Sequence, residues 1–457
     1  MELFHLLKLA RRLSLLLIFA MALQGCDKYL SIEPRASVSE ESAIVDEASL
    51  NTALRGAYRS LGSGGYYGGD YTLEGFVPSG NVIYQVFNNL QNLNFLPEDA
   101  SFQSSWNAIY QTINIVNNII AKIPEIKDIN LSDDERNRIT GEAYFIRALA
   151  YFDLARAFGG VPLKLTPTTD LKEVSGLQRS SLDETYHQVL NDLEKAEDLL
   201  APEVNRIRAT KYTVWALRAR YHLYREEWTQ AAQYATRVID LSENYSLVSP
   251  FKSWFADGVT QTKESIFEIA FSPANTNSLR TTMSLQAKGG EYRFRPSDDV
   301  IDKLNDPLTG GGRIALLDSV KQSGSTLYAG ALYYRSPATD PVYVLRIAEQ
   351  YLIRAEARAH LNDLPGALND LNKIRHRANL PDSKAVTQDQ ILDAILSERR
   401  FEFLWEAQRY FDLTRTGKLE AEIKKLKPNL EISSKHYLFP IPANEVIIGG
   451  LKQNPGY

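Results

Sequence analysis

The stretch Tyr351-Leu-Ile-Arg-Ala-Glu-Ala-Arg-Ala-His360 indicates most clearly how the chain folds, because its opening signature occurs three times. The signature is an aromatic residue, two variable residues, Arg and Ala, and it stands at 144–148, 215–219 and 351–355. The last two copies continue in register without a gap. Four pairs match: Ala219 with Ala355, Trp228 with Leu364, Ala231 with Ala367, and Val238 with Ile374. An aromatic residue, small residues, a turn and a second helix that opens with Ala are typical of tetratricopeptide helical hairpins.

The spacing of the copies predicts long insertions between the hairpins. The copies lie 71 and 136 residues apart, whereas tetratricopeptide units repeat about every 34 residues. We therefore expect a mainly α-helical fold with loop-rich, partly β insertions. The helical hairpin scaffold is expected at about 46–61, 101–245 and 346–425, and the loop-rich regions at about 62–100 and 246–345.

Local signals place some of the boundaries. Ser132-Asp-Asp-Glu135 is a capping box, which predicts a helix that runs to Gly159-Gly160. Pro440 and Pro442 prevent a helix, so a C-terminal segment of about 426–457 is expected to wrap across the body as an extended chain. Short β-like runs occur within the second insertion at 265–271, 327–334 and 342–345.

The N-terminus carries the features of a lipoprotein signal peptide. Lys8, Arg11 and Arg12 precede an apolar run at 13–23, which is too short to span a bilayer. Leu23-Gln-Gly-Cys26 follows, and Cys26 is the only cysteine of the chain. We expect residues 1–25 to be removed and Cys26 to be acylated, which leaves 26–457 as a single domain. An ordinary secretory signal with a cysteine nearby by chance is the alternative.

Composition narrows the range of functions. The chain has 457 residues, of which 44% are hydrophobic and 23% charged, as in globular proteins. Its formal net charge is −5 with both signs interspersed, which argues against nucleic acid as a partner. With Cys26 acylated, no thiol remains for disulfides, metal binding or catalysis. The six histidines show no metal-ligand spacing, and we expect no metal and no cofactor.

Several stretches together resemble the RagB/SusD family, the outer-membrane nutrient-binding lipoproteins of Bacteroidetes. The first is Glu142-Ala-Tyr-Phe-Ile-Arg-Ala-Leu-Ala-Tyr-Phe-Asp-Leu-Ala-Arg-Ala-Phe-Gly-Gly-Val-Pro162. The second is Glu398-Arg-Arg-Phe-Glu-Phe-Leu-Trp-Glu-Ala-Gln-Arg-Tyr-Phe-Asp412. The third comprises Tyr437-Leu-Phe-Pro-Ile-Pro442 and the terminal Gln453-Asn-Pro-Gly-Tyr457. With the signal peptide, the resemblance extends over the whole chain and is weakest in the two loop-rich regions.

The resemblance implies a surface-exposed lipoprotein, held in the outer membrane by its lipid, that is not an enzyme. Such a protein captures oligosaccharides and delivers them to a SusC-like TonB-dependent transporter, whose barrel it caps. Two alternatives stay open: capture of oligopeptides with the same scaffold, and a structural lid without ligand binding of its own.

No catalytic motif is recognisable. The chain lacks a G-x-S-x-G elbow, an H-E-x-x-H zinc helix and a P-loop. Glu398, Glu402, Glu406, Arg409 and Asp412 follow helical spacing, and we interpret them as ion pairs that hold the last helix to the scaffold. Glycoside hydrolases separate their two carboxylates widely in sequence, so an enzyme remains the weaker alternative.

Aromatic and planar polar residues in the two loop-rich regions are the candidate ligand-binding residues. Sugar rings stack on aromatic faces, and their hydroxyl groups need polar partners. The first cluster comprises Tyr66, Tyr67, Asp70, Tyr71, Asn81, Phe87 and Asn88, with Tyr84 between them. The second comprises Tyr292, Arg293, Tyr333 and Tyr334. For each aromatic residue, packing within its own loop is the competing interpretation.

Overall fold

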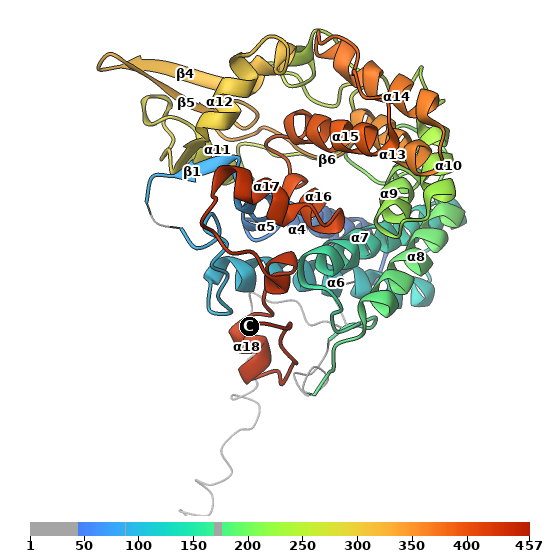
Figure 1. The fold of residues 1–457 in the computed structure, drawn as a ribbon. Helices are drawn as coiled ribbons and strands as arrows, with labels where there is room; N and C mark the ends of the chain where they lie inside the picture. The colour runs from blue at the N-terminus through green and yellow to red at the C-terminus, as the bar shows by residue number, and fades with distance from the viewer. Residues whose placement is uncertain (1–43, 87, 169–175) are drawn as a thin grey trace, which may run out of the picture. The chain divides into compact units, whose positions relative to one another are not determined.

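The repeated signature lies on helices that pair as hairpins in the computed structural model of the chain (Figure 1). Helix α9 (Lys211–Tyr224) pairs with α10 (Trp228–Ile239), and α13 (Ile347–His360) pairs with α14 (Leu364–Arg377). The earliest copy of the signature lies on α7 (Asp133–Phe158), which packs along α8 (Leu182–Leu199). The predicted helical scaffold is therefore confirmed.

The structure describes residues 44–86, 88–168 and 176–457. The predicted signal peptide, Cys26 and Phe87 lie outside the described residues. Contacts divide the chain into a unit of Met1–Val45 and a unit of Asp46–Tyr457, and every described helix and strand belongs to the second unit. Three further long helices pack beside these hairpins: α4 (Glu47–Leu61), α6 (Ala100–Lys122) and α15 (Gln388–Glu402).

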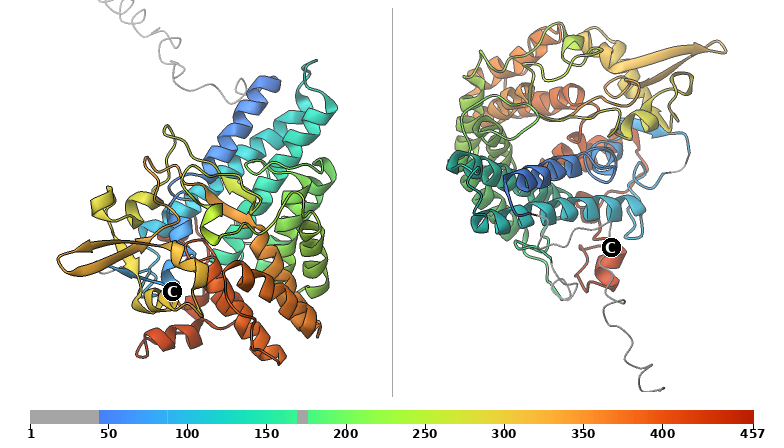
Figure 2. Two further views of the ribbon diagram at one scale, coloured as in Figure 1. Left: turned by 90° about the horizontal axis from the view of Figure 1, so that it is seen from above. Right: turned by 180° about the vertical axis from the view of Figure 1, so that it is seen from behind.

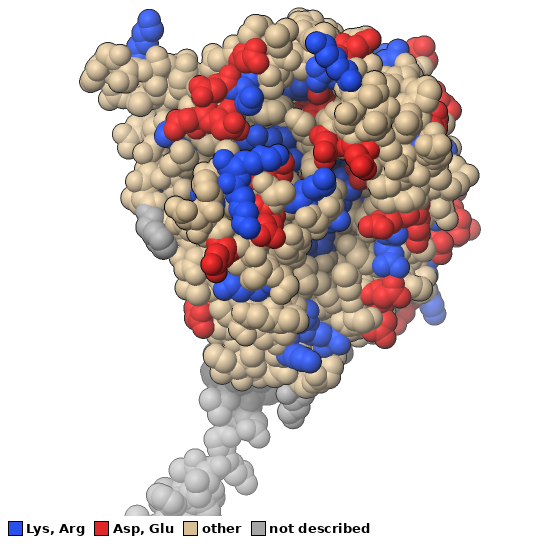
Figure 3. Space-filling view, in the orientation of Figure 1, with Lys and Arg blue, Asp and Glu red and all other residues tan. Residues whose placement is uncertain are grey.

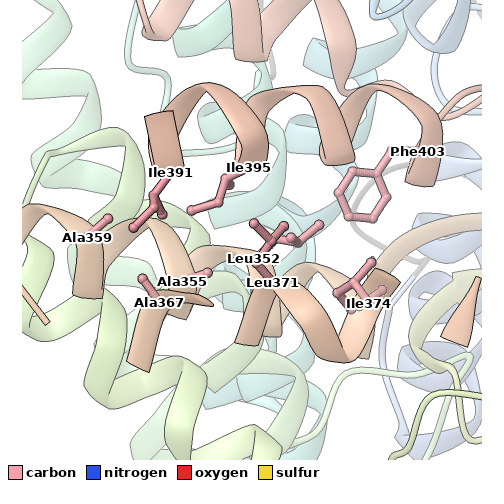
Figure 4. Close-up of a cluster of buried hydrophobic side chains, with 10 residues drawn as sticks. Leu352, Ala355, Ala359, Ala367, Leu371, Ile374, Ile391, Ile395 and Phe403 are labelled. Atoms are coloured by element: carbon pink, nitrogen blue, oxygen red, sulfur yellow. The ribbon is translucent and has the colours of Figure 1, made fainter. Parts of the chain in front are cut away.

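Small residues allow the scaffold helices to approach closely. Ala355 and Ala359 of α13 face Ala367 of α14, and all three are fully buried (Figure 4). Ile391 and Ile395 of α15 close the same cluster from the other side. Because alanine leaves room for the neighbouring helix, α13 and α14 pack closely, and the larger side chains of the cluster fill the space between them and α15.

An aromatic stack joins the two hairpins that carry the aligned copies. The rings of Trp228, at the start of α10, and His360, at the end of α13, lie parallel, with centroids 3.9 Å apart and an interplanar angle of 8°. Figure 2 shows the scaffold helices side by side, with the hairpin of β4 (Leu317–Gln322) and β5 (Ser325–Gly330) extending away from them. The stack between Trp228 and His360 links one hairpin to the next, although neither residue is the aromatic that opens the repeated signature.

Predicted helix boundaries are reproduced where a cap defines them. The Ser132 hydroxyl accepts a hydrogen bond from the Glu135 amide at 3.2 Å and opens α7. The Glu135 carboxylate, however, binds Arg138 and Asn51, and the Ser132 amide donates to the Asn130 carbonyl, so only the hydroxyl half of the predicted capping box forms. At the other end, Gly159 has a φ of 80°, a left-handed conformation that glycine adopts without strain.

The loop-rich regions contain three two-stranded antiparallel sheets among the described residues. β2 (Ser265–Ile269) pairs with β6 (Val342–Arg346), which confirms two of the predicted β-like runs. The third run differs, since β5 spans Ser325–Gly330 and pairs with β4 (Leu317–Gln322). The third sheet joins the two regions, because β1 (Val82–Tyr84) pairs with β3 (Phe294–Pro296). Short helices complete the unit: α5 (Asp70–Glu74), α11 (Leu279–Met283), α12 (Asp298–Asn305), α16 (Arg409–Arg415), α17 (Leu419–Leu426) and α18 (Ala443–Ile447).

The C-terminal segment crosses the scaffold, as the two prolines predict. The Phe439 amide donates to the Ala157 carbonyl at 2.8 Å, and the Asn454 side chain donates to the Phe158 carbonyl at 2.9 Å. The Phe439 ring stacks on Phe102 with centroids 4.8 Å apart. The segment is not extended throughout, since it contains α18. Among the described residues, no helix has the length and apolar character needed to cross a bilayer.

Candidate functional site

Three of the predicted ligand-binding tyrosines belong to the core. Tyr66, Tyr67 and Tyr71 are at most 2% exposed. The hydroxyl groups of Tyr66 and Tyr67 donate to the same carboxylate oxygen of Asp153, at 2.6 and 2.7 Å, and their rings stack with centroids 4.7 Å apart. Burial, and after it the Asp153 charge, raises the pKa of both hydroxyl groups well above the usual value.

These tyrosines therefore cannot present a ring face to a ligand in this structure. Tyr71 contacts the Arg156 guanidinium, whose Nε lies 2.7 Å from the tyrosine hydroxyl oxygen. The competing interpretation, packing, is the correct one for these three residues. The three tyrosines are buried because Asp153 of α7 is a buried carboxylate, which needs hydrogen-bond donors around it.

Two polar residues of the first cluster have different environments. Asp70 is half-buried at the start of α5, where burial raises the pKa of its carboxyl group and a hydrogen bond from Ser104 opposes this shift. Asn81 is fully buried; its side-chain oxygen accepts from Arg400 Nε at 2.8 Å. Its backbone carbonyl accepts from the Ser297 amide at 2.9 Å. Asn81 thus ties β1 to α15 and cannot meet a ligand in this structure.

The β1–β3 pairing brings the two sequence clusters together. Tyr84 lies opposite Phe294, with ring centroids 5.2 Å apart, and the Gln85 amide donates to the Arg293 carbonyl at 2.9 Å. Burial raises the pKa of Tyr84 to about 12, with Arg293 lowering it and Asp70 raising it. Charges from both clusters therefore act on one tyrosine.

The rim of this pairing is exposed. Gln85 and Val86 are exposed, and Asn88 is half-buried, with its side-chain oxygen accepting from the Gln91 amide at 2.9 Å. Across the ladder, the Arg293 side chain is 60% exposed and forms an ion pair with Glu291. This rim is the part of the two clusters where polar groups reach solvent together.

Tyr292 is held in an uncommon backbone conformation beside the rim. Its φ is 50°, in the left-handed region that few non-glycine residues adopt. Its hydroxyl group donates to the Tyr328 carbonyl at 2.9 Å, which fixes the ring against β5. A cavity of about 260 Å³ opens next to it, lined by Leu285, Gln286, Ala287, Tyr292, Val320, Lys321, Gln322 and Leu327. Strained residues are frequent at binding sites, where the surrounding structure holds them in place.

Tyr333 and Tyr334 lie elsewhere. Tyr333 is fully buried, so a stacking role for it is excluded in this structure. Tyr334 is half-buried, and burial, followed by a hydrogen bond with Asp257, raises its pKa to about 12. The next residue, Arg335, binds the carbonyls of Ala256 and Val259 at 2.6 and 2.7 Å, so this segment packs on the 255–259 loop.

We define the rim surface as Asp70, Tyr84, Gln85, Asn88, Tyr292 and Arg293, with the adjoining cavity. It contains four of the predicted residues: Asp70, Asn88, Tyr292 and Arg293. Gln85 was missed by the sequence reasoning. The only signal for it was its place directly after a short β-like run, Val82-Ile-Tyr84, which by itself does not tell which strand it pairs with.

The acidic residues near the C-terminus form buried ion pairs, as interpreted from the sequence. Glu402 contacts Arg346 at 3.0 Å, Arg313 at 3.0 Å and also Arg377, and all four side chains are at most 3% exposed. Glu406 accepts from Arg346 at 2.7 Å. Carboxylates that are saturated by guanidinium groups and shielded from solvent do not form an accessible acid–base pair.

These residues follow helical spacing in the sequence, but they do not lie on one continuous helix. α15 ends at Glu402 and α16 begins at Arg409. Between them, Trp405 is buried and donates from its indole nitrogen to the Leu316 carbonyl at 2.9 Å, which draws the segment into the core. The partners of the acidic residues come from other elements, above all from Arg346 at the end of β6.

The distribution of charge and of possible metal ligands are two further features of the molecule that bear on its function. Basic and acidic side chains lie side by side on the face drawn in Figure 3. Across residues 44–86, 88–168 and 176–457, no group of three or more His, Cys, Asp or Glu side chains is placed to hold a metal ion.

Two family models match the chain. A model of the SusD family matches residues 329–457, and a model described as "Starch-binding associating with outer membrane" matches residues 28–223. Together the two segments span most of the chain, including α7, α8 and the hairpin of α13 and α14, whereas α10 and most of the second loop-rich region lie between them.

Individual proteins are similar over nearly the whole chain. SusD-like protein P38 of Formosa agariphila is 27% identical, and the match covers 88% of this chain and 90% of that protein. The starch-binding protein SusD of Bacteroides thetaiotaomicron is 26% identical, over 72% of this chain and 74% of its own length. A solved SusD superfamily structure from Bacteroides vulgatus superposes with a TM-score of 0.81 at 23% identity, covering 90% of this chain and 99% of that one, and shows the same fold.

Proposed function

Because this chain belongs to the SusD/RagB family, a family of binding proteins, we propose that it binds oligosaccharides and does so at the rim surface. The observation that carries the proposal is the β1–β3 pairing, which joins two loop regions that are more than two hundred residues apart in sequence. It brings the exposed Gln85 next to Arg293, whose side chain is 60% exposed, and Tyr292, the residue before Arg293, lines the adjoining cavity. These are the groups that sugar rings and hydroxyl groups require.

The individual groups have distinct roles in this proposal. The Tyr292 ring, fixed through its hydroxyl group, provides an apolar face beside the cavity. Arg293 offers donors in a planar array, and the side chains of Gln85 and Asn88 can each donate and accept. Since the bond to the Tyr328 carbonyl fixes the Tyr292 ring within the protein, little ordering of this ring remains to be done on binding.

The location follows from the N-terminal motif and the family. One of the matching models describes association with the outer membrane. We propose that an acylated Cys26 provides the attachment, since a multiply acylated cysteine holds a protein to a bilayer without a membrane-spanning helix. In this arrangement the protein passes its cargo to a SusC-like TonB-dependent transporter and does not cleave it.

Binding is tested by isothermal titration calorimetry of the purified chain with neutral glucose oligomers and, in parallel, with a mixture of short peptides. We expect saturable binding of an oligosaccharide, and a loss of at least tenfold in affinity in Tyr292→Ala and in Arg293→Ala. Arg55→Ala is the matched control, because Arg55 is an exposed arginine on α4 with one contact to its own helix.

Three results would contradict the proposal. Binding of peptides alone would favour oligopeptide capture. Absence of any binding, with uptake in cells still dependent on the protein, would favour a structural lid. New reducing ends during the incubation would show hydrolysis and would contradict the assignment as a binding protein.

A further inference from the structure

A second cavity, of about 470 Å³, lies between α6 and the C-terminal segment, and none of the rim-surface residues lines it. Its volume is in the range of small-molecule binding sites, about 300–1,000 Å³. We call it the α6 slot. The lining residues used in the argument are Trp106, Asn107, Tyr110, Gln111, Pro162 and Glu445.

The floor of the α6 slot is aromatic and rigid, and the half-buried Tyr110 provides the ring face that a ligand can reach, because Trp106 beside it is only 3% exposed. Trp106 and Tyr110, one turn apart on α6, pack with ring centroids 5.0 Å apart. The Tyr110 hydroxyl group donates to the Pro162 carbonyl at 2.8 Å, and Trp106 packs edge-on against Phe158 at 5.2 Å. Because both rings are held from behind, the floor exists before any ligand arrives.

Neutral amides line the mouth. Asn107 and Gln111 are exposed and also one turn apart, so their side chains lie next to the aromatic pair along the same helix. The side-chain oxygen of Asn107 accepts from Gln103 at 2.8 Å, and the Gln103 amide also donates to Glu445 at 3.3 Å. An amide both donates and accepts, which matches the hydrogen-bonding capacity of a sugar hydroxyl group.

The walls are tied to α6 by further amides. The Asn117 side chain donates to the carbonyls of Lys164 and Thr166 at 2.9 and 3.2 Å, and its oxygen accepts from Arg147 at 2.8 Å. The C-terminal segment is held nearby by a bond from the Ala443 amide to the carbonyl of Pro97, which precedes α6, at 2.8 Å. The slot is thus preformed by contacts that do not depend on its occupant.

We propose that the α6 slot is a second carbohydrate-binding site, which takes one pyranose unit of a neutral oligosaccharide. An aromatic floor beside uncharged amides suits the apolar face and the hydroxyl groups of such a ring. The inference rests on the proposed oligosaccharide binding but concerns different residues, so each site can fail without the other.

The intrinsic fluorescence of Trp106 tests the proposal. Purified chain carrying Tyr292→Ala and Arg293→Ala, which removes the rim surface, is titrated with an α-1,4-linked and a β-1,3-linked glucose heptamer. We expect one of these oligomers to shift the tryptophan emission saturably. The shift should vanish in Trp106→Phe, and the affinity should fall at least tenfold when Asn107→Ala and Gln111→Ala are added. Asn118→Ala, an amide on the same helix outside the slot, is the control and should leave the titration unchanged.

The outcomes separate the two sites. Oligomer binding that is lost with Tyr292 and Arg293, with no emission shift left in that background, would overturn the α6 slot and leave the rim surface intact. A titration that is indifferent to Asn107→Ala and Gln111→Ala would also overturn it. No binding of either oligomer to the unmodified chain would overturn both. Unfolding midpoints of all variants confirm that each remains folded.

Discussion

Arg147 of α7 donates two parallel hydrogen bonds to Asp192 of α8, from Nε to Oδ2 and from Nη2 to Oδ1, and each is 2.8 Å long. Arg354 of α13 makes the same pair of bonds with Asp370 of α14, with the same lengths. In both hairpins the arginine is the fourth residue of the repeated signature. In the first and third copies the signature therefore joins the two helices of a hairpin through a bidentate ion pair as well as through small apolar residues, whereas Arg218 of the second copy pairs with Glu197 of α8.

Arg147→Met should lower the free energy of unfolding by about 3–5 kcal/mol, because it leaves the fully buried Asp192 without its counter-charge. Arg354→Met should lower the free energy of unfolding by less, since Arg358 also donates to Asp370 at 2.8 Å. Urea unfolding at pH 7 measures both. Equal losses in the two variants would contradict this account, and adding Asp192→Leu to Arg147→Met should restore much of the stability.

Glu402 is expected to stabilise the fold in a pH-dependent way. Burial alone would raise the pKa of its carboxyl group, but Arg377, Arg313 and Arg346 outweigh burial and hold the pKa at about 2. Because this value lies below that of the unfolded chain, the stabilisation is complete above about pH 4.5 and is lost as the pH falls towards 2. Glu402→Gln should therefore be most destabilising at pH 7, and its deficit should shrink between pH 4.5 and 3 in urea titrations.

Glu406 should change the stability of the fold with pH in the opposite direction. Its burial raises the pKa to about 7, despite the hydrogen bonds from Arg346. The folded state then binds the proton more tightly than the unfolded state between about pH 4.5 and 7, so stability falls as the pH rises through this range. In Glu406→Gln this slope should disappear. A Glu406→Gln variant whose unfolding midpoint varies with pH as the unmodified chain's does would contradict the assignment.

Tyr67→Phe should affect stability and not ligand affinity. The lost hydroxyl group donates to Asp153, a buried carboxylate, and a bond of this kind contributes about 1.5–3 kcal/mol. Tyr292→Phe is the matched comparison: it removes a half-exposed bond to a neutral carbonyl and should cost less. Thermal unfolding measures both losses, and calorimetry with an oligosaccharide that binds the unmodified chain measures affinity. Weakened sugar binding in a normally stable Tyr67→Phe would return Tyr67 to the candidate site.

Cys26→Ser should detach the protein from membranes. Without the thiol no acyl chain can be added, and no helix of the described residues offers another span. Fractionation of cells that express the full chain should move the protein from the membrane pellet to the soluble fraction, and mass spectrometry of the unmodified chain should show an acylated N-terminal peptide. A Cys26→Ser protein that stays with the membrane would contradict the predicted anchor.

Local sequence patterns were sufficient to predict the helical hairpins. The spacing of alanines and aromatics along 215–238 and 351–374 lies within one or two helices, so it predicted α9, α10, α13 and α14 without knowledge of the rest of the chain. Capping residues also predicted helix ends from local sequence, since Ser132 opens α7 and Gly159 ends it. The amides of α6 were overlooked, because the apolar stripe on the same helix dominates the pattern there.

The tertiary structure alone decided which aromatic residues can meet a ligand. Tyr66 and Tyr292 stand in equally loop-like, glycine-rich surroundings, yet Tyr66 is buried on Asp153 and Tyr292 is half-exposed on the rim surface. The sequence by itself determined the helices, since their periodicity is local. It could not determine burial or the β1–β3 pairing, because both depend on contacts between residues that only the folded chain brings together.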